Sequence, residues 1–289
     1  MGFSHFNSFY RKKYIIHIVE NKFNENIKKI IKNKQFNKYI YIFKKIPSKQ
    51  EYLLTISATG SIERFGLIKN FLKKNKTKFL LLEKFCFLRI KHFEEFDKKF
   101  SNTTKTFVNS WAYILAKKMN FPKKIKGFDL ICHIREGSLL ANITHIFHLF
   151  SYLNNKSTTQ KFYNNNCKII KNVKRKLYDE LKGTIEVEHL NKNKLIIKTK
   201  KKMNDLITFS IYFKNLSMNY RLSITKNNMV QYYKSGKKIK EINFPYSSIT
   251  SLIFLKKILN NNNNRYMPSF QNDYEISKLI LNKFKIKIP

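Results

Sequence analysis

The chain has 289 residues, of which 58 are Lys or Arg and 18 are Asp or Glu, so its formal net charge is +40. Hydrophobic residues make up 43% of the chain and aromatic residues 15%, which is too apolar for a disordered polycation. No apolar run approaches the roughly 18 residues of a membrane-spanning helix. The 3 cysteines are too few for a disulfide framework. We therefore expect a soluble chain with a hydrophobic core, in a reducing compartment.

The positive charge is spread along the whole chain. Residues 1–50 carry a net charge of +10, residues 51–153 also +10, and residues 154–289 +20. Lys outnumbers Arg 51 to 7, and Asn, Ile and Phe are abundant, which is typical of an AT-rich genome such as that of an organelle. Codon bias explains the choice of Lys over Arg, but it does not explain the scarcity of acids. A charge spread in this way favours a protein that contacts nucleic-acid phosphates on several sides.

The first half of the chain predicts alternating strands and helices. Runs rich in Ile, Tyr and Phe predict strands, and apolar residues three and four positions apart predict helices. We expect strands at Tyr14–Val19, Tyr39–Phe43, Tyr52–Ser57, within 78–93 and at Gly127–Arg135, helices at Asn24–Lys32, Thr106–Met119 and Ser138–Leu153, and a charged connection at Glu94–Lys99. This order predicts an α/β core domain over residues 37–155, with a mixed sheet flanked by helices, after a basic N-terminal extension at 1–36.

The polar stretch Asn154–Asn166 predicts a domain boundary. Beyond it we expect a basic α+β C-terminal extension over residues 156–289. Its expected elements are a helix at Lys168–Lys182, an antiparallel meander of strands at Thr184–His189, Lys194–Thr199, Leu206–Phe213 and Tyr220–Thr225, and helices at Ser248–Leu259 and Tyr274–Phe284.

Three short motifs occur along the expected core domain. Thr55–Ile62 is a strand end that turns through a Gly, Thr103–Thr106 precedes an expected helix that ends in Ala116–Met119, and Gly137 lies in the turn before the next helix. In the order of these motifs, residues 39–153 resemble the small-subunit ribosomal protein eleven family, whose members have a similar strand end, an Ala-rich helix ending in Ala-Lys-Lys, and a Gly-rich turn. The chain keeps only Gly137 of that Gly-rich turn.

This resemblance implies a platform-protein fold and a structural role in the small subunit of a mitochondrial ribosome, within the organelle matrix. It implies ribosomal RNA and neighbouring ribosomal proteins as partners, and no catalysis, cofactor, metal, membrane or small-molecule substrate. Seven basic residues are candidate RNA contacts: Lys105, Lys117, Arg135, Lys171, Arg175, Lys237 and Lys238.

Other chemistry was weighed against this interpretation. His145 and His148 lie on an expected helix, downstream of Cys132. Without a compact Cys-x-x-Cys pair, these residues do not predict a zinc site. We expect both histidines on the face of the helix opposite its buried stripe. Glu186 and Glu188 share a strand face and would hold Mg²⁺ in the alternative, an organelle RNA-processing enzyme or intron-maturation factor. A DNA-packaging protein is a third possibility. With only 7 Gly residues and no Gly-x-Gly-x-x-Gly, a loop that cradles nucleotide phosphates is not expected.

Overall fold

A computed structural model describes residues 2–9, 14–20, 25, 39–120, 127–171, 179–214, 219–245, 247–260 and 266–284. The chain forms two compact units, and both are discontinuous in sequence. Unit 1 comprises Met1–Trp111 and Pro245–Phe270, and unit 2 comprises Ala112–Phe244 and Gln271–Pro289. The division into units 1 and 2 does not test whether segments bounded at residues 36 and 155 fold alone, so these expected domain boundaries stay a prediction.

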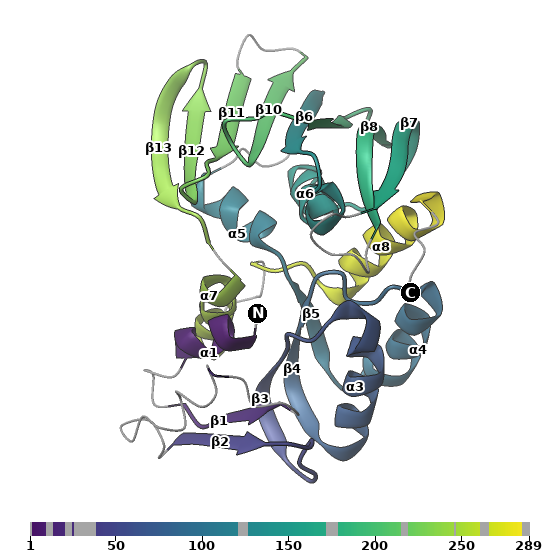
Figure 1. The fold of residues 1–289 in the computed structure, drawn as a ribbon, viewed down its shortest axis with the longest axis vertical. Coiled ribbons are helices and arrows are strands. Elements are labelled where there is room, and N and C mark those ends of the chain that lie inside the picture. The colour runs from purple at the N-terminus through teal and green to yellow at the C-terminus, as the bar shows by residue number, and fades with distance from the viewer. Residues whose placement is uncertain are drawn as a thin grey trace. The chain divides into compact units, whose positions relative to one another are not determined.

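Unit 1 is built on parallel strands (Figure 1). The strands β3, β4 and β5 form one parallel sheet in that order, and β1 pairs in parallel with β2. The elements of unit 1 are α1 (Gly2–Phe9), β1 (Ile16–Val19), β2 (Ile40–Phe43), β3 (Glu51–Ser57), α3 (Ser61–Lys74), β4 (Lys76–Glu83), α4 (Ile90–Phe100), β5 (Lys105–Asn109) and α7 (Ser247–Leu259).

Helices cover both faces of the β3-β4-β5 sheet. The helix α3 packs on β4, and α4 packs on α3, as Figure 1 shows. Phe254 of α7 contacts Phe79 of β4 and Phe107 of β5, with ring centroids 6.4 Å and 5.2 Å apart. A strand covered on both faces is apolar on both faces, which explains why successive residues of β4, Leu80 and Leu81, are both 0% exposed.

Unit 2 is built on an eight-stranded sheet with the order β13-β12-β11-β10-β6-β9-β8-β7. The strand β6 runs parallel to β9 and antiparallel to β10, and the other pairs are antiparallel. The elements of unit 2 are α5 (Trp111–Lys118), β6 (Phe128–Arg135), α6 (Leu139–Leu153), β7 (Gln160–Lys171), β8 (Asp179–His189), β9 (Lys194–Lys200), β10 (Ile207–Phe213), β11 (Asn219–Ile224), β12 (Met229–Lys234), β13 (Lys237–Asn243) and α8 (Phe270–Phe284).

The central strand β6 has one buried and one open face. Phe128, Leu130, Cys132 and Ile134 are all 0% exposed, as their alternation predicts. The helix α6 packs on β6 and β8. Because α6 is apolar around most of its circumference, it is buried on nearly every side. The residues of β6 between the buried ones are half-buried or exposed, and they contribute to the open face of the sheet.

Most elements expected from the sequence are confirmed, and a mixed sheet flanked by helices is present. Four expectations are wrong. The expected antiparallel meander is interrupted, because β6 lies between β9 and β10 in the sheet. Residues 168–171 and 179–182 belong to the strands β7 and β8, where a helix was expected, and Glu94–Lys99 lies within helix α4. Residues 106–109 form strand β5, so the expected helix begins only at Trp111. The helix expected at Asn24–Lys32 lies outside the described residues, except for Glu25.

The two corrections in which a strand replaces an expected helix have a common physical cause. Apolar residues spaced for a helix also fit a strand when a neighbouring strand is available, because tertiary pairing overrides local propensity. The backbone N–H of Val108 in β5 donates to the carbonyl of Pro268 at 3.0 Å, so β5 has a partner from a distant part of unit 1. Among the described residues, no helix is long and apolar enough to cross a membrane.

Substituting Gly183 with Ala should destabilise unit 2. Gly183 has φ +135°, and a Cβ there would collide with the backbone carbonyl of Asn166 on β7. We expect the free energy of unfolding in urea to fall by roughly 2–4 kcal/mol. The matched control is Gly66→Ala in the exposed part of α3, where a Cβ meets no atom within 4 Å. That change should be neutral or stabilising by up to about 1 kcal/mol. Equal midpoints for the two variants would contradict the assignment of strain to Gly183.

Candidate functional site

Unit 1 has the strand order at which open α/β sheets bind ligands. The strand β1 lies beside β3, since the His17 Nδ1 atom is 3.0 Å from the Tyr52 hydroxyl. The strands β1 and β2 form a sheet separate from β3-β4-β5, and the side-chain contact between β1 and β3 gives the spatial succession 2-1-3-4-5 across the two sheets. In sheets of this order, ligands bind beyond the carboxyl ends of the strands, near the point where the order reverses. The residues at these ends are therefore the candidate site.

A buried carboxylate lies at the end of β4. Glu83 is 1% exposed, and its Oε1 atom accepts hydrogen bonds from the Asn109 amide at 2.6 Å and pairs with His5 Nε2 at 3.0 Å. His5 comes from α1, and its Nδ1 atom is 3.0 Å from the Ser251 hydroxyl of α7. The Thr250 hydroxyl donates to Asn109 Oδ1 at 2.5 Å. Side chains of α1 and α7 thus meet the ends of β4 and β5.

The charge of Glu83 is stabilised by these partners. Burial by itself raises the pKa of the Glu83 carboxyl, but the hydrogen bond and charge of His5, the Asn109 amide and the charge of Lys84 lower it. The lowering wins, and the pKa lies below its ordinary value of 4.5. Glu83 is therefore a carboxylate at neutral pH. Its Oε2 atom is buried and has no hydrogen-bond partner among the described residues.

A buried arginine holds the loops beside this carboxylate. Arg64 of α3 is 1% exposed, and its guanidinium donates to the backbone carbonyls of Thr59 at 2.5 Å, Glu83 at 2.5 Å and Cys86 at 3.2 Å. A fork of fixed donors suits several carbonyls at once. Arg64 therefore ties the loop after β3 to the loop after β4. Together, Arg64, Glu83, His5 and Asn109 form a closed network at the strand ends.

A second buried polar cluster lies within unit 2. His148 of α6 and Asp273 of α8 are both 0% exposed, and the His148 Nε2 atom is 3.3 Å from Asp273 Oδ1. The Ser277 hydroxyl donates to Asp273 Oδ2 at 3.3 Å. Burial raises the pKa of the neighbouring Tyr113 to about 12, so its phenol is neutral at physiological pH. The His148 Nδ1 and Thr144 Oγ1 atoms have no hydrogen-bond partner within the part of the chain that the structure describes.

The expectation that His145 and His148 lie opposite the buried stripe of their helix is wrong. His145 is 3% and His148 0% exposed, because α6 is enclosed on nearly all sides. Among the described residues, no group of three metal-ligating side chains gathers. Glu186 and Glu188 do share one face of β8, where both are half-buried.

The structure scatters the seven candidate RNA contacts. Lys105 belongs to unit 1, whereas the others belong to unit 2. Lys105 is the exposed first residue of β5, Lys117 is half-buried in α5, Arg135 is exposed at the end of β6, Lys171 ends β7, Lys237 and Lys238 are exposed at the start of β13, and Arg175 lies outside the described residues. Lys238 pairs with Glu241 of its own strand. Whether any of the seven contacts an anion stays a prediction.

The sequence held one signal for the network at the strand ends. Glu83 directly follows the apolar run Phe79–Leu82, and an acid at the end of a buried strand is a candidate site residue. Its partners could not be found in this way. His5 is 78 residues away in sequence, and nothing in the N-terminal segment marks its histidine as a partner of Glu83.

No protein-family model matches the sequence, and no curated protein matches it. Solved structures do resemble its fold. A putative NADPH-dependent oxidoreductase from Desulfitobacterium hafniense has a TM-score of 0.67 at 9% identity, covering 97% of this chain and 90% of that one. The transcriptional regulator Gal80p from Kluyveromyces lactis has a TM-score of 0.64 at 12% identity, with coverages of 97% and 87%. A dehydrogenase (MviM) from Clostridium difficile has a TM-score of 0.56 at 12% identity, with coverages of 89% and 87%.

These likenesses establish the fold, which this chain shares with an oxidoreductase, a dehydrogenase and a transcriptional regulator. The resemblance to the ribosomal protein family is wrong, because the fold of nearly the whole chain matches proteins of a different kind. The structural role on ribosomal RNA, the ribosomal partners, the lack of a small-molecule ligand and the alternative of an RNA-processing factor fall with it. The mitochondrial location stays a prediction. Both enzymes and a regulator share the fold, so the fold alone is compatible with either role.

The residues after β1 do not fit the phosphates of a nicotinamide dinucleotide. Such phosphates lie against a Gly-rich turn after the first strand, where only glycine lets the backbone approach closely enough. Here the sequence from Glu20 to Tyr39 contains no Gly, and after Gly2 the next glycine is Gly60. In addition, the carboxylate at the end of β4 is bonded to the chain's own His5. No hydride-transfer step is therefore derived for this chain.

The Glu83→Gln variant should change how stability depends on pH. Because the pKa of Glu83 is lowered in the folded protein, its charge stabilises the fold above the ordinary value of 4.5, and this contribution is lost as the pH falls through the lower folded value. Urea unfolding from pH 7 to pH 3 should show a constant difference between wild type and variant above about pH 5, shrinking below it. The control is Glu51→Gln, which removes an exposed carboxylate paired with Lys76. An identical pH profile for Glu83→Gln and wild type would contradict the role of this carboxylate.

Substitutions of the His148–Asp273 pair should be unequal in effect. His148→Leu removes the imidazole beside the buried Asp273 carboxyl and should cost roughly 1–3 kcal/mol, whereas His148→Leu combined with Asp273→Leu should recover part of that loss. The measurement is the free energy of unfolding in a double-mutant cycle. The exposed Lys76–Glu51 pair serves as control, with an expected coupling of at most about 1 kcal/mol. Simple additivity at His148 and Asp273 would show that the two side chains do not interact.

Proposed function

We propose that this chain is a ligand-binding protein of the oxidoreductase fold that acts through binding and not through nicotinamide-dependent turnover. The observation that carries the proposal is the absence of glycine between Glu20 and Tyr39, where the fold places its dinucleotide phosphates. Side chains with a Cβ hold an incoming diphosphate away from the backbone N–H groups. The fold is thus retained without its main phosphate contact.

The closed network at the strand ends supports the same proposal. Glu83 is bonded to His5 and Asn109, and Asn109 is in turn bonded to Thr250. The Oε1 atom of Glu83 must lose one of these hydrogen bonds before it can meet a nicotinamide or ribose, and that loss weakens binding. The likeness to Gal80p adds support, since that structure is of a transcriptional regulator and shows that a non-enzymatic role occurs on a similar fold.

Titration with NADH and NADPH tests the proposal. We expect no saturable change in cofactor fluorescence when the full-length protein is titrated with up to about 1 mM cofactor. A Kd of about 1 mM corresponds to a binding free energy of only about −4.1 kcal/mol. The oxidoreductase from Desulfitobacterium hafniense provides the positive control under the same conditions. Saturable binding in the micromolar range at the strand ends of unit 1, or consumption of NADPH in the presence of carbonyl compounds, would overturn the proposal.

A further inference from the structure

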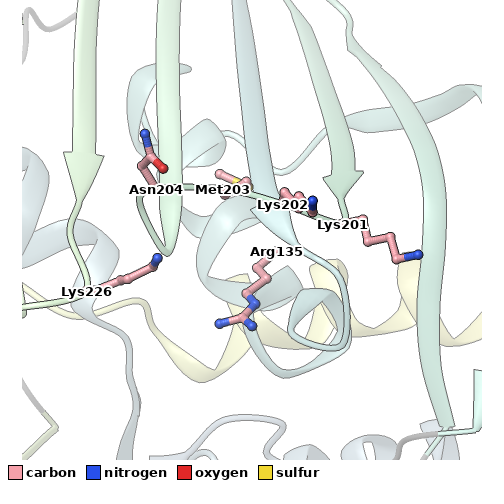
Figure 2. A pocket seen from close by; sticks show the side chains of 6 residues that line it. All are labelled: Arg135, Lys201, Lys202, Met203, Asn204 and Lys226. Atoms are coloured by element: carbon pink, nitrogen blue, oxygen red, sulfur yellow. The ribbon is translucent and has the colours of Figure 1, made fainter.

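Unit 2 carries a basic hollow at one end of the open face of its sheet (Figure 2). Arg135, Lys201, Lys202, Met203, Asn204 and Lys226 line a cavity of about 450 Å³. In the figure, Arg135 lies between Lys226 on one side and Lys201 and Lys202 on the other. Lys202, Met203 and Asn204 also line an adjoining hollow of about 430 Å³ on the sheet itself. We call these two connected hollows the basic hollow.

The strand register places cations next to one another in this hollow. Arg135 of β6 is paired with Lys200 of the parallel strand β9, so the two backbones are about 4.8 Å apart. Arg221 of β11 is directly opposite Ser210 of β10, and it lines the part of the hollow on the sheet. Lys201 and Lys202 follow from the loop after β9, and Lys226 from the loop after β11. Charges from three strands and two loops therefore converge.

Almost no negative charge opposes these cations. Asp205 is the one acid among the residues that line the hollow, and its Oδ2 atom is 3.6 Å from Arg221 Nη2. The pKa of His133, which also lines the hollow, reflects the positive charge around it. Partial burial lowers the pKa of His133, and the charges of Lys200, Lys198 and Arg221 lower it further. Like charges held together in this way are relieved by an anion.

The hollow also offers neutral hydrogen-bonding groups. Thr208, Ser210 and Tyr212 alternate along β10, so all three side chains lie on the open face. Their hydroxyls can donate to phosphoryl oxygens or bond the hydroxyls of a sugar. The hollow thus combines cations that can bind phosphates with hydroxyls that can bind a sugar, and its volume is within the range of small-molecule sites.

The rest of the open face favours a compact anion over a polymer. Further from the hollow, the same face carries the acids Asp129 of β6 and Glu186 and Glu188 of β8. Asp129 is 3.6 Å from the Lys214 ammonium, so even a nearby cation is paired there. A nucleic-acid strand running along the sheet would meet these carboxylates, whereas a ligand confined to the hollow would not.

We propose that the basic hollow binds a soluble diphosphate-bearing ligand of nucleotide size, with Arg135, Lys200 and Arg221 on the phosphates and the β10 hydroxyls on its sugar. The site lies wholly within unit 2, so it does not depend on the network at the strand ends of unit 1. It places a diphosphate away from the strand ends of unit 1, where the fold places its dinucleotide phosphates.

Isothermal titration calorimetry with sodium pyrophosphate and with ADP tests this proposal on the full-length protein. We expect saturable binding of both, tighter for ADP, and weaker binding of inorganic phosphate. Arg135→Gln combined with Arg221→Gln should weaken the affinity for pyrophosphate about tenfold or more, because two charge-assisted hydrogen-bonding groups are lost. The matched control is Lys237→Gln combined with Lys238→Gln, which removes the same net charge from the exposed start of β13. The control should bind as wild type does, and circular dichroism establishes that both variants are folded.

Three outcomes would overturn the proposal. They are the absence of saturable binding to pyrophosphate and ADP, an equal loss of affinity in the control, and preferential binding of a DNA oligonucleotide or anionic vesicles. Since NADPH also contains a diphosphate, its titration is repeated with the Arg135→Gln, Arg221→Gln variant. NADPH binding that disappears in this variant belongs to the hollow, and binding that persists belongs to unit 1. The two proposals can therefore fail separately.

Discussion

Two buried charges, those of Arg64 and Glu83, determine how the strand ends of unit 1 are arranged. A charge can leave water only when hydrogen bonds replace its hydration. Arg64 obtains them from the carbonyls of the loops after β3 and β4, and Glu83 obtains them from His5 and Asn109. Because these partners come from α1, β4 and β5, and α7 reaches them through Thr250, the requirement for paired charges brings distant segments together. The strand ends that form the candidate site are thus also a place where buried hydrogen bonds stabilise unit 1.

That double role bears on how the fold relates to function. In an open parallel sheet, the carboxyl ends of the strands normally hold polar groups in reserve for a ligand. Here the polar groups at β4 and β5 are bonded within the protein, and the segment after β1 lacks the glycines of a phosphate turn. The open face of the sheet in unit 2 has the opposite character, since its cations at Arg135 and Lys200–Lys202 have little acid beside them. In this chain, therefore, the exposed cations that could bind phosphate lie in unit 2 and not at the strand ends of unit 1.

The sequence predicted elements best where the apolar pattern had a single period. The alternation of Phe128, Leu130, Cys132 and Ile134 defined β6, and the apolar helix after it was also correct, because each pattern has a single period. The segment 168–182 was wrong, since its spaced apolar residues suit a helix while the long pairing of β7 with β8 decides the structure. The network of Glu83 could not be predicted, because its hydrogen bonds join residues up to 246 positions apart. Of the residues that line the basic hollow, only Arg135 was predicted from the sequence as an RNA contact.

The interleaving of the two units has a consequence for synthesis on the ribosome. Unit 1 needs Pro245–Phe270 for α7, and unit 2 needs Gln271–Pro289 for α8. Neither unit can be completed until these segments have left the exit tunnel, although β6 and its neighbours are made long before them. In the meantime His148 lacks Asp273, and the apolar face of β5 lacks Phe254. Nascent chains of this protein therefore pass through a period with both cores open, when long-range pairing is slow and aggregation competes with folding.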